Sequence, residues 1–142
     1  MMKCLCQLVI LAGLVVTSVG CSGGPGDTPE IGHIEGTVSL NGEPVAHANI
    51  MYKPLEGGRV SNGVSDADGH YVIYYKANVP GAKVGKHVVK VWTATDEVGT
   101  PGTEDYQPAI KETIPEKYLG SNSELKVDVE PGHNTIPLDL TS

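Results

Sequence analysis

Hydrophobic and polar residues alternate along the chain from residue 34 onward. In residues 34–40, the apolar Ile34 and Val38 share one side of an extended chain, and polar residues fill the other side. A period of two is typical of strands with one buried face. The alternation recurs between short turns and predicts seven strands, at residues 34–40, 48–52, 63–65, 70–75, 86–93, 125–129 and 135–140.

Turn signals separate these strands. The dipeptide Asn41-Gly42 is a strong hairpin signal, because both residues tolerate positive φ angles. In residues 66–69, we expect the two aspartate side chains to cap backbone amides and Gly69 to adopt a positive φ. The last two predicted strands flank residues 130–134, and we expect them to pair with each other.

The strand predicted at residues 86–93 has a clear two-sided pattern. Its predicted inner face holds His87, Val89 and Val91. Its predicted outer face holds Val88, Lys90 and Trp92. Lys90 assigns the outer face, because an ammonium group is almost never fully buried without a partner.

Composition agrees with many short strands. The 142 residues include Gly 18 and Pro 10, and no stretch after residue 21 shows a convincing helical stripe. Phenylalanine is absent, so the core is expected to consist of aliphatic residues and tyrosine. The sequence therefore predicts one all-β domain, a seven-stranded immunoglobulin-like sandwich, at residues 34–142.

The first 20 residues have the layout of a cleaved signal peptide. Lys3 precedes the apolar residues 5–16, and small residues follow. A helix over residues 5–16 spans about 18 Å, against a hydrocarbon core of about 30 Å, which makes a permanent membrane anchor the weaker alternative. Export is the expected fate of the chain.

The cysteines suggest lipidation. Val19-Gly20-Cys21 resembles the lipobox of bacterial lipoproteins, although Ser18 stands where that motif usually has leucine. The resemblance implies cleavage before Cys21 and acylation of its thiol; cleavage near Gly20 that leaves a free thiol is the alternative. Since the other two cysteines lie within the signal peptide, the mature chain has no partner for a disulfide. Residues 21–33 then form the lipidated cysteine and a flexible tether.

The net charge of the chain limits the classes of partner that it can bind. The chain has 10 basic and 17 acidic residues, for a net charge of −7, and no basic run. Nucleic acid is therefore an unsuitable partner. An acidic domain is also repelled by anionic lipid headgroups, so attachment to the membrane is expected to come from the lipid on Cys21.

Four short motifs, in order, carry a family resemblance. They are Ile34-Glu35-Gly36-Thr37-Val38, Asn41-Gly42-Glu43-Pro44-Val45-Ala46-His47-Ala48, Ser65-Asp66-Ala67-Asp68-Gly69-His70-Tyr71 and Val84-Gly85-Lys86-His87-Val88-Val89. Residues 34–140 thereby resemble the carboxypeptidase regulatory-like family of transthyretin-like sandwiches, with His87 where the family usually has an aromatic residue. The resemblance implies a non-catalytic module and supplies no catalytic residues.

Motifs for enzymatic or metal chemistry are weak. Ser123 and Lys126 match Ser-x-x-Lys in letters only, and the five histidines lack zinc-motif spacing, so we expect no catalytic site, cofactor or zinc site. The chain also lacks the Tyr-Arg-Gly-Ser ending of the transthyretin-like hydroxyisourate hydrolases, and Arg59 is its only arginine. Asp66 and Asp68 are the sole calcium candidates, with turn capping as the favoured interpretation.

A ligand face is predicted around Trp92, together with Val88, Lys90 and Tyr106. Tyr106 belongs to a long acidic loop at residues 95–117, which either binds a partner or cation, covers the Trp92 ring, or is a solvated flap. The leading hypothesis is a lipid-anchored, non-enzymatic module of the bacterial envelope that binds an envelope protein or glycan. The alternatives are a structural subunit that associates through strand edges, and an unrecognised hydrolase.

Overall fold

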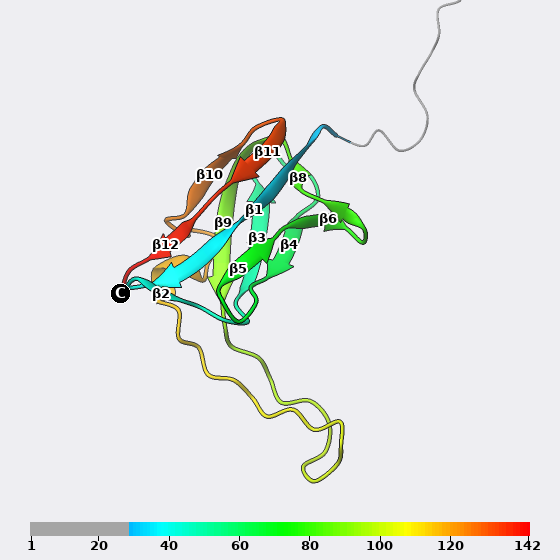
Figure 1. Ribbon diagram of the computed structural model, residues 1–142, viewed down its shortest axis with the longest axis vertical. Helices are drawn as coiled ribbons and strands as arrows, with labels where there is room; N and C mark the ends of the chain where they lie inside the picture. Colours follow the sequence, from blue (N-terminus) through cyan, green and yellow to red (C-terminus); the bar gives the residue numbers. More distant parts are fainter. Residues whose placement is uncertain (1–28) are drawn as a thin grey trace, which may run out of the picture.

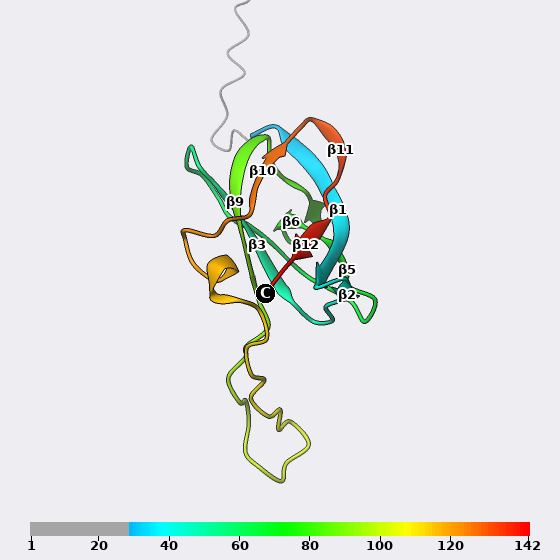
Figure 2. The same ribbon diagram turned by 90° about the vertical axis from the view of Figure 1, so that its left-hand side faces the viewer.

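The computed structural model describes residues 29–142, so the predicted signal peptide and the lipidation site at Cys21 lie outside the described residues. Regular structure in this part is nearly all β, apart from the short 3-10 helix η1 (Glu116–Tyr118). Two six-stranded sheets form two layers around an apolar core (Figure 1, Figure 2). The expected all-β sandwich is confirmed.

The first sheet is organised around β1 (Ile31–Leu40), which begins within the predicted tether rather than at residue 34. Along one edge, β1 pairs in parallel with two strands from the end of the chain, β11 (Gly132–Thr135) and β12 (Leu138–Leu140). Along its other edge, it pairs antiparallel with three short strands, β2 (Glu43–Pro44), β5 (His70–Val72) and β8 (Ala82–Lys83).

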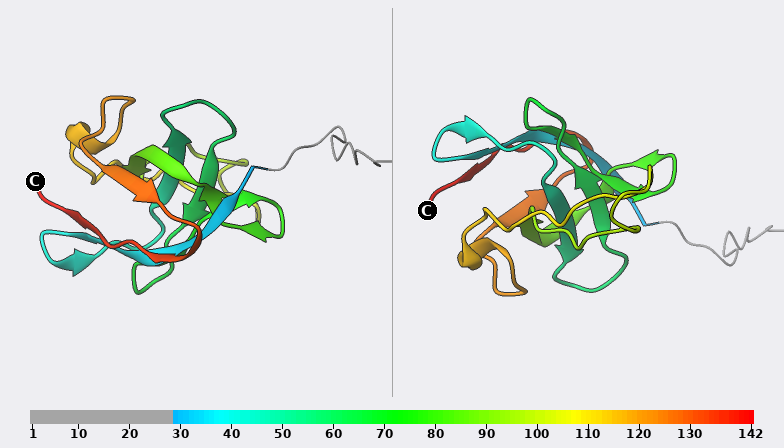
Figure 3. Two further views of the ribbon diagram at one scale, coloured as in Figure 1. Left: turned by 90° about the horizontal axis from the view of Figure 1, so that it is seen from above. Right: turned by 90° about the horizontal axis from the view of Figure 1, so that it is seen from below.

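The second sheet is antiparallel throughout. Its strands lie in the order β10 (Lys126–Val129), β9 (Gly85–Trp92), β3 (Asn49–Pro54), β4 (Ser61–Val64), β6 (Tyr74–Lys76) and β7 (Val79–Pro80). Figure 3 shows the two layers from above and below.

The described part of the chain is divided into twelve strand segments, where the sequence pattern predicted seven. The predicted strand 70–75 divides at Ile73, because β5 belongs to the first sheet and β6 to the second. The predicted strand 135–140 divides before Leu138, where Pro137 has no N–H group for the ladder.

The expected pairing of the last two predicted strands is wrong. β10 pairs with β9 in the second sheet, whereas β11 and β12 pair with β1 in the first. Glu130 and Pro131 therefore carry the chain from one sheet to the other, and the remaining residues of the predicted turn, 132–134, belong to β11. A pattern of period two predicts strands, but it does not contain the long-range pairing that decides which strand each one lies beside.

A hydrogen-bonded tyrosine pair crosses the core between the sheets. The hydroxyl groups of Tyr52 on β3 and Tyr71 on β5 lie 2.9 Å apart, and both side chains are buried. Since the Tyr71 hydroxyl donates to the Ile136 carbonyl, it accepts the hydrogen bond from Tyr52. Burial raises the pKa of Tyr71 to about 12, so this network is uncharged at neutral pH. The expected core of aliphatic residues and tyrosine is present.

Candidate functional site

The outer face of the second sheet carries a shallow groove beside Trp92. The alternation on β9 is as predicted for its inner face, where His87, Val89 and Val91 are buried. Trp92 is half-buried on the opposite face. Strand register places Asn49 next to Trp92 and then Val64 next to Asn49, so three strands contribute to one row of side chains.

This Trp92 groove has a volume of about 430 Å³. It is lined by Asn49, Ile50, Asn62, Gly63, Val64, Tyr74 and Trp92. Tyr74 enters because β6 pairs with β4 at Asn62. The exposed fractions of Val64 and Tyr74 are 57% and 47%, which is high for large apolar side chains. The groove offers aromatic and aliphatic surface together with two amides and no ionised side chain.

The four predicted ligand-face residues do not form one site. Val88 was expected on the exposed face but is only 6% exposed, because β9 lies between two strands and the register places Lys53 and Lys126 on either side of it. Lys90 remains on the outer face, one row away from Trp92, and does not line the groove. Tyr106 lies elsewhere, in the segment that follows β9.

That segment is a projecting arm, residues 93–115 (Figure 1, Figure 2). Two antiparallel bridges join its halves, Thr95 to Ile110 and Val98 to Gln107. The Tyr106 hydroxyl donates to Glu97 within the arm, at 3.4 Å. The groove-lining residues include none from the arm, so the arm does not close the Trp92 groove.

A carboxylate fastens the base of the arm. Glu112 accepts hydrogen bonds from the backbone N–H groups of Thr93, Ile114 and Ala94, at 3.0, 2.9 and 3.3 Å. Burial raises the pKa of the Glu112 carboxyl, but these hydrogen bonds outweigh burial and hold that pKa below its usual value. Glu112 is therefore a structural group rather than part of an acidic ligand surface.

The predicted turn at residues 66–69 has the expected geometry. One carboxylate oxygen of Asp66 accepts hydrogen bonds from the N–H groups of Asp68 and His70, both at 2.9 Å. Gly69 has a φ of 79°. Asp66 thus acts as a turn cap, and the alternative calcium role for Asp66 and Asp68 receives no support from a third ligand among the described residues.

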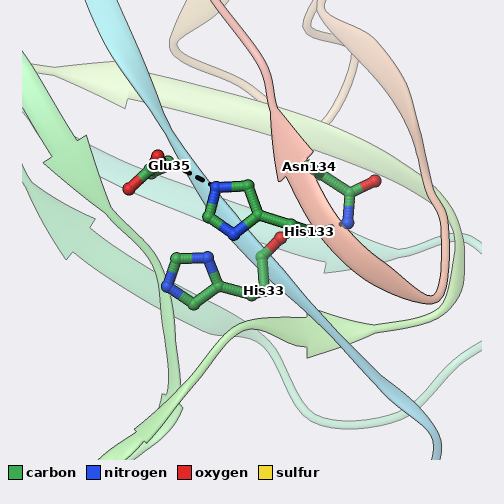
Figure 4. A network of polar contacts seen from close by, with 4 residues as sticks. All are labelled: His33, Glu35, His133 and Asn134. Atoms are coloured by element: carbon green, nitrogen blue, oxygen red, sulfur yellow. Dashed lines mark hydrogen bonds and ion pairs between the residues drawn. The ribbon is translucent and has the colours of Figure 1, made fainter.

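A second cluster lies on the outer face of the first sheet (Figure 4). The parallel register of β1 and β11 places His33 beside His133, and their rings stack at 4.5 Å with an interplanar angle of 18°. His133 Nε2 lies 2.9 Å from a carboxylate oxygen of Glu35. We call His33, Glu35 and His133 the histidine cluster.

Asn134 holds the backbone beneath the histidine cluster. Its side-chain amide donates to the carbonyl groups of His33 and Glu130, at 3.0 and 2.8 Å. Its side-chain oxygen accepts a hydrogen bond from the Glu130 N–H group, at 3.0 Å. Sequence reasoning missed this cluster, because no local spacing signals that two histidines so far apart become neighbours.

His87 has a different environment from the clustered histidines. It is fully buried, with its ring 5.9 Å from that of Tyr52. Its Nε2 donates to the Lys83 carbonyl at 2.7 Å, while Nδ1 is buried without a hydrogen-bond partner in the described part of the chain. Burial lowers the pKa of His87, so its imidazole is neutral at pH 7. It occupies the predicted inner face as a core residue.

Comparisons with known proteins give no relative: the chain matches no family model, no curated protein and no solved structure. Across residues 29–142, there is no helical segment with the length and hydropathy that a membrane crossing requires. The fold defines a nearly all-β sandwich with two dissimilar outer faces.

Proposed function

We propose that this protein is an exported, lipid-anchored and non-catalytic module of the bacterial envelope, of the carboxypeptidase regulatory-like type, that binds a neutral glycan in the Trp92 groove. The observation that carries the proposal is the groove itself, where Trp92 and Tyr74 lie on the same sheet face with two asparagine amides between them.

The lining favours a saccharide over other ligands. A sugar ring has an apolar face of C–H groups, which packs on an aromatic ring, and an edge of hydroxyl groups. Asn49 and Asn62 each provide amide donors and an acceptor for such hydroxyls. A few polar groups set in apolar surface are typical of small-ligand sites. The absence of ionised side chains among the lining residues favours a neutral ligand.

Fluorescence provides the test, because Trp92 is the sole tryptophan. The full chain is titrated with neutral oligosaccharides of hexoses and N-acetylhexosamines. We expect a saturable change in emission and about tenfold weaker binding by Tyr74→Ala and by Asn62→Ala, equivalent to about 1.4 kcal/mol. Tyr106→Ala is the matched control and should bind as wild type. The proposal is wrong if no saccharide binds, or if Tyr74→Ala has wild-type affinity.

The lipid anchor is tested separately by detergent phase partition. Multiply acylated Cys21 should place the wild-type protein in the detergent phase, and Cys21→Ala should move it to the aqueous phase, because each buried methylene of the lipid contributes about 0.8 kcal/mol. Recovery of both proteins from the aqueous phase would contradict the lipoprotein assignment and leave the glycan test unaffected.

Association through a strand edge is the second candidate. β10 is an outermost strand of the second sheet, and a depression of about 290 Å³ next to it is lined by Leu55, Lys86, Lys126, Val127 and Asp128. Leu55 is 54% exposed there. If the protein associates with another protein through this edge, Asp128→Pro should abolish the association, because proline removes a backbone N–H group from the edge strand. Trp92→Ala should leave the association unchanged.

A further inference from the structure

The geometry points to a binding site for a divalent transition-metal ion, of the Zn²⁺ or Cu²⁺ class, formed by the histidine cluster of His33, Glu35 and His133. This inference is independent of glycan binding, because it concerns the other sheet. It differs from the sequence-based expectation of no metal site, which rested on local spacing alone.

The first argument is the separation of the donor atoms. One donor atom from each of the three side chains lies within 4.8 Å of the others. Bonds from a metal ion to imidazole nitrogen and carboxylate oxygen are about 2.0–2.2 Å, so bound donors lie roughly 3 Å apart. His133 Nε2 and the Glu35 carboxylate already lie 2.9 Å apart. His33 needs only a side-chain rotation that opens the stacked rings.

The second argument is a nitrogen atom without a partner. His33 Nδ1 is buried, yet it has no hydrogen-bond partner among the described residues. Buried polar atoms are nearly always hydrogen-bonded, so a ring nitrogen in this state is an unused donor or ligand atom. Figure 4 shows the His33 ring beneath the His133 ring, on the same side of the sheet as Glu35.

The third argument is the rigidity of the scaffold. Both histidines lie on strands that are paired in register, and Asn134 ties the backbone of β11 to the His33 carbonyl. The backbone positions of the three ligand residues are therefore fixed before a metal ion arrives.

The donor types select the class of ion. Two imidazoles and one carboxylate suit Zn²⁺, Cu²⁺ or Ni²⁺, whereas Ca²⁺ and Mg²⁺ prefer sites made of oxygen ligands alone. Three protein ligands leave at least one coordination position for water or another ligand. That position faces solvent, because the exposed fractions of the His133 and Glu35 side chains are 58% and 35%.

The test is a titration of the full chain with Zn²⁺ by calorimetry and with Co²⁺ by visible absorption. The cysteines are first alkylated, so that thiolates cannot bind the metal. We expect one ion per chain and a rise in the melting temperature with Zn²⁺. His33→Ala and His133→Ala should each weaken binding by at least tenfold, since even outer hydrogen-bond partners of metal ligands change affinity by about 10- to 100-fold.

The matched control is His47→Asn, which removes an exposed histidine outside the cluster at a position where φ is 55° and asparagine is well tolerated. It should bind Zn²⁺ as wild type. Circular dichroism without metal identifies any variant that fails to fold, and Glu35→Gln provides a further variant that keeps a hydrogen-bond acceptor. The inference is overturned if the alkylated wild type binds no Zn²⁺, or if the three cluster variants bind it as tightly as His47→Asn.

Discussion

The outer faces of the two sheets carry different chemistry on one scaffold. On the second sheet, Trp92 and Tyr74 border a groove without ionised groups. On the first sheet, outward-facing positions hold His33, Glu35 and His133, which contact one another through ring stacking and a hydrogen bond. The outer face of the second sheet is suited to a neutral ligand with apolar surface, and the outer face of the first sheet is suited to a cation.

The two faces also differ in how the chain builds them. Antiparallel strands within one stretch of sequence bring the Trp92 groove together. The histidine cluster depends on parallel pairing between β1 and β11, and Glu35 and His133 are 98 residues apart in the sequence. Substitutions in β1 are therefore expected to disturb the histidine cluster more than the Trp92 groove.

Gly36→Ala should give the largest loss of stability. A methyl group on Gly36 would lie 2.1 Å from the Ile136 carbonyl oxygen, closer than real contacts allow, so β1 and the C-terminal segment must separate. We expect a loss of about 3 kcal/mol in the free energy of unfolding in urea. Gly120→Ala, which meets no side chain within 4 Å, is the control and should change stability by less than about 0.5 kcal/mol. Equal urea midpoints for the two variants would contradict this account of β1.

Tyr71→Phe should give the next largest effect, because it acts on the core that both faces share. The substitution leaves the buried Tyr52 hydroxyl and the Ile136 carbonyl without their partner. We expect a loss of about 2 kcal/mol in urea unfolding. Tyr75→Phe is the control, since the Tyr75 hydroxyl makes no hydrogen bond to a described residue and the loss should be below about 0.5 kcal/mol. A wild-type midpoint for Tyr71→Phe would show that the tyrosine pair does not stabilise the sandwich.

Much of the fold follows from sequence patterns, because alternation and turn residues act locally. Asn41 and Gly42 have the expected positive φ angles, and Asp66 caps its turn as expected. Strand partners do not follow from local pattern, as the wrong pairing around residues 130–134 demonstrates. For the same reason, the alternation within one strand is enough to predict that Trp92 faces outward. The contact between His33 and His133 depends on the register of β1 with β11, which no local pattern contains.

Buried His87 should make the stability of the fold depend on pH, unlike an exposed histidine. Burial lowers the pKa of His87, with Asp128 and Lys83 as the nearby charges, whereas its imidazole in the unfolded chain binds a proton near pH 6.5. The neutral His87 imidazole therefore stabilises the folded protein fully above pH 6.5. The free energy of unfolding should fall as the pH drops below that value, since the unfolded state then binds more protons. His87→Leu should flatten the change in urea midpoint between pH 7 and pH 5, and His47→Asn should not. An unchanged slope in His87→Leu would show that the buried imidazole does not govern this range.

Glu35→Gln is expected to have the smallest effect on stability and a large effect on metal binding. The glutamine oxygen still accepts the hydrogen bond from His133, and exposed ion pairs contribute little. The urea midpoint at pH 7 should therefore not change measurably. The hydrogen bond from His133 lowers the pKa of Glu35. Whatever stability the ionised Glu35 carboxylate adds is therefore present above pH 4.5 and is lost as the pH falls further.

Zn²⁺ calorimetry on this Glu35→Gln variant then separates the two roles of the first sheet. A Zn²⁺ affinity more than tenfold weaker, with an unchanged urea midpoint, would mean that the Glu35 carboxylate binds the metal ion and does not stabilise the fold. Weaker binding together with a lower midpoint would instead mean that Glu35 holds the face together, and that the loss of affinity is a consequence of disorder. The Trp92 groove gives the internal reference, because saccharide binding on the other sheet should be the same in this variant as in the wild type.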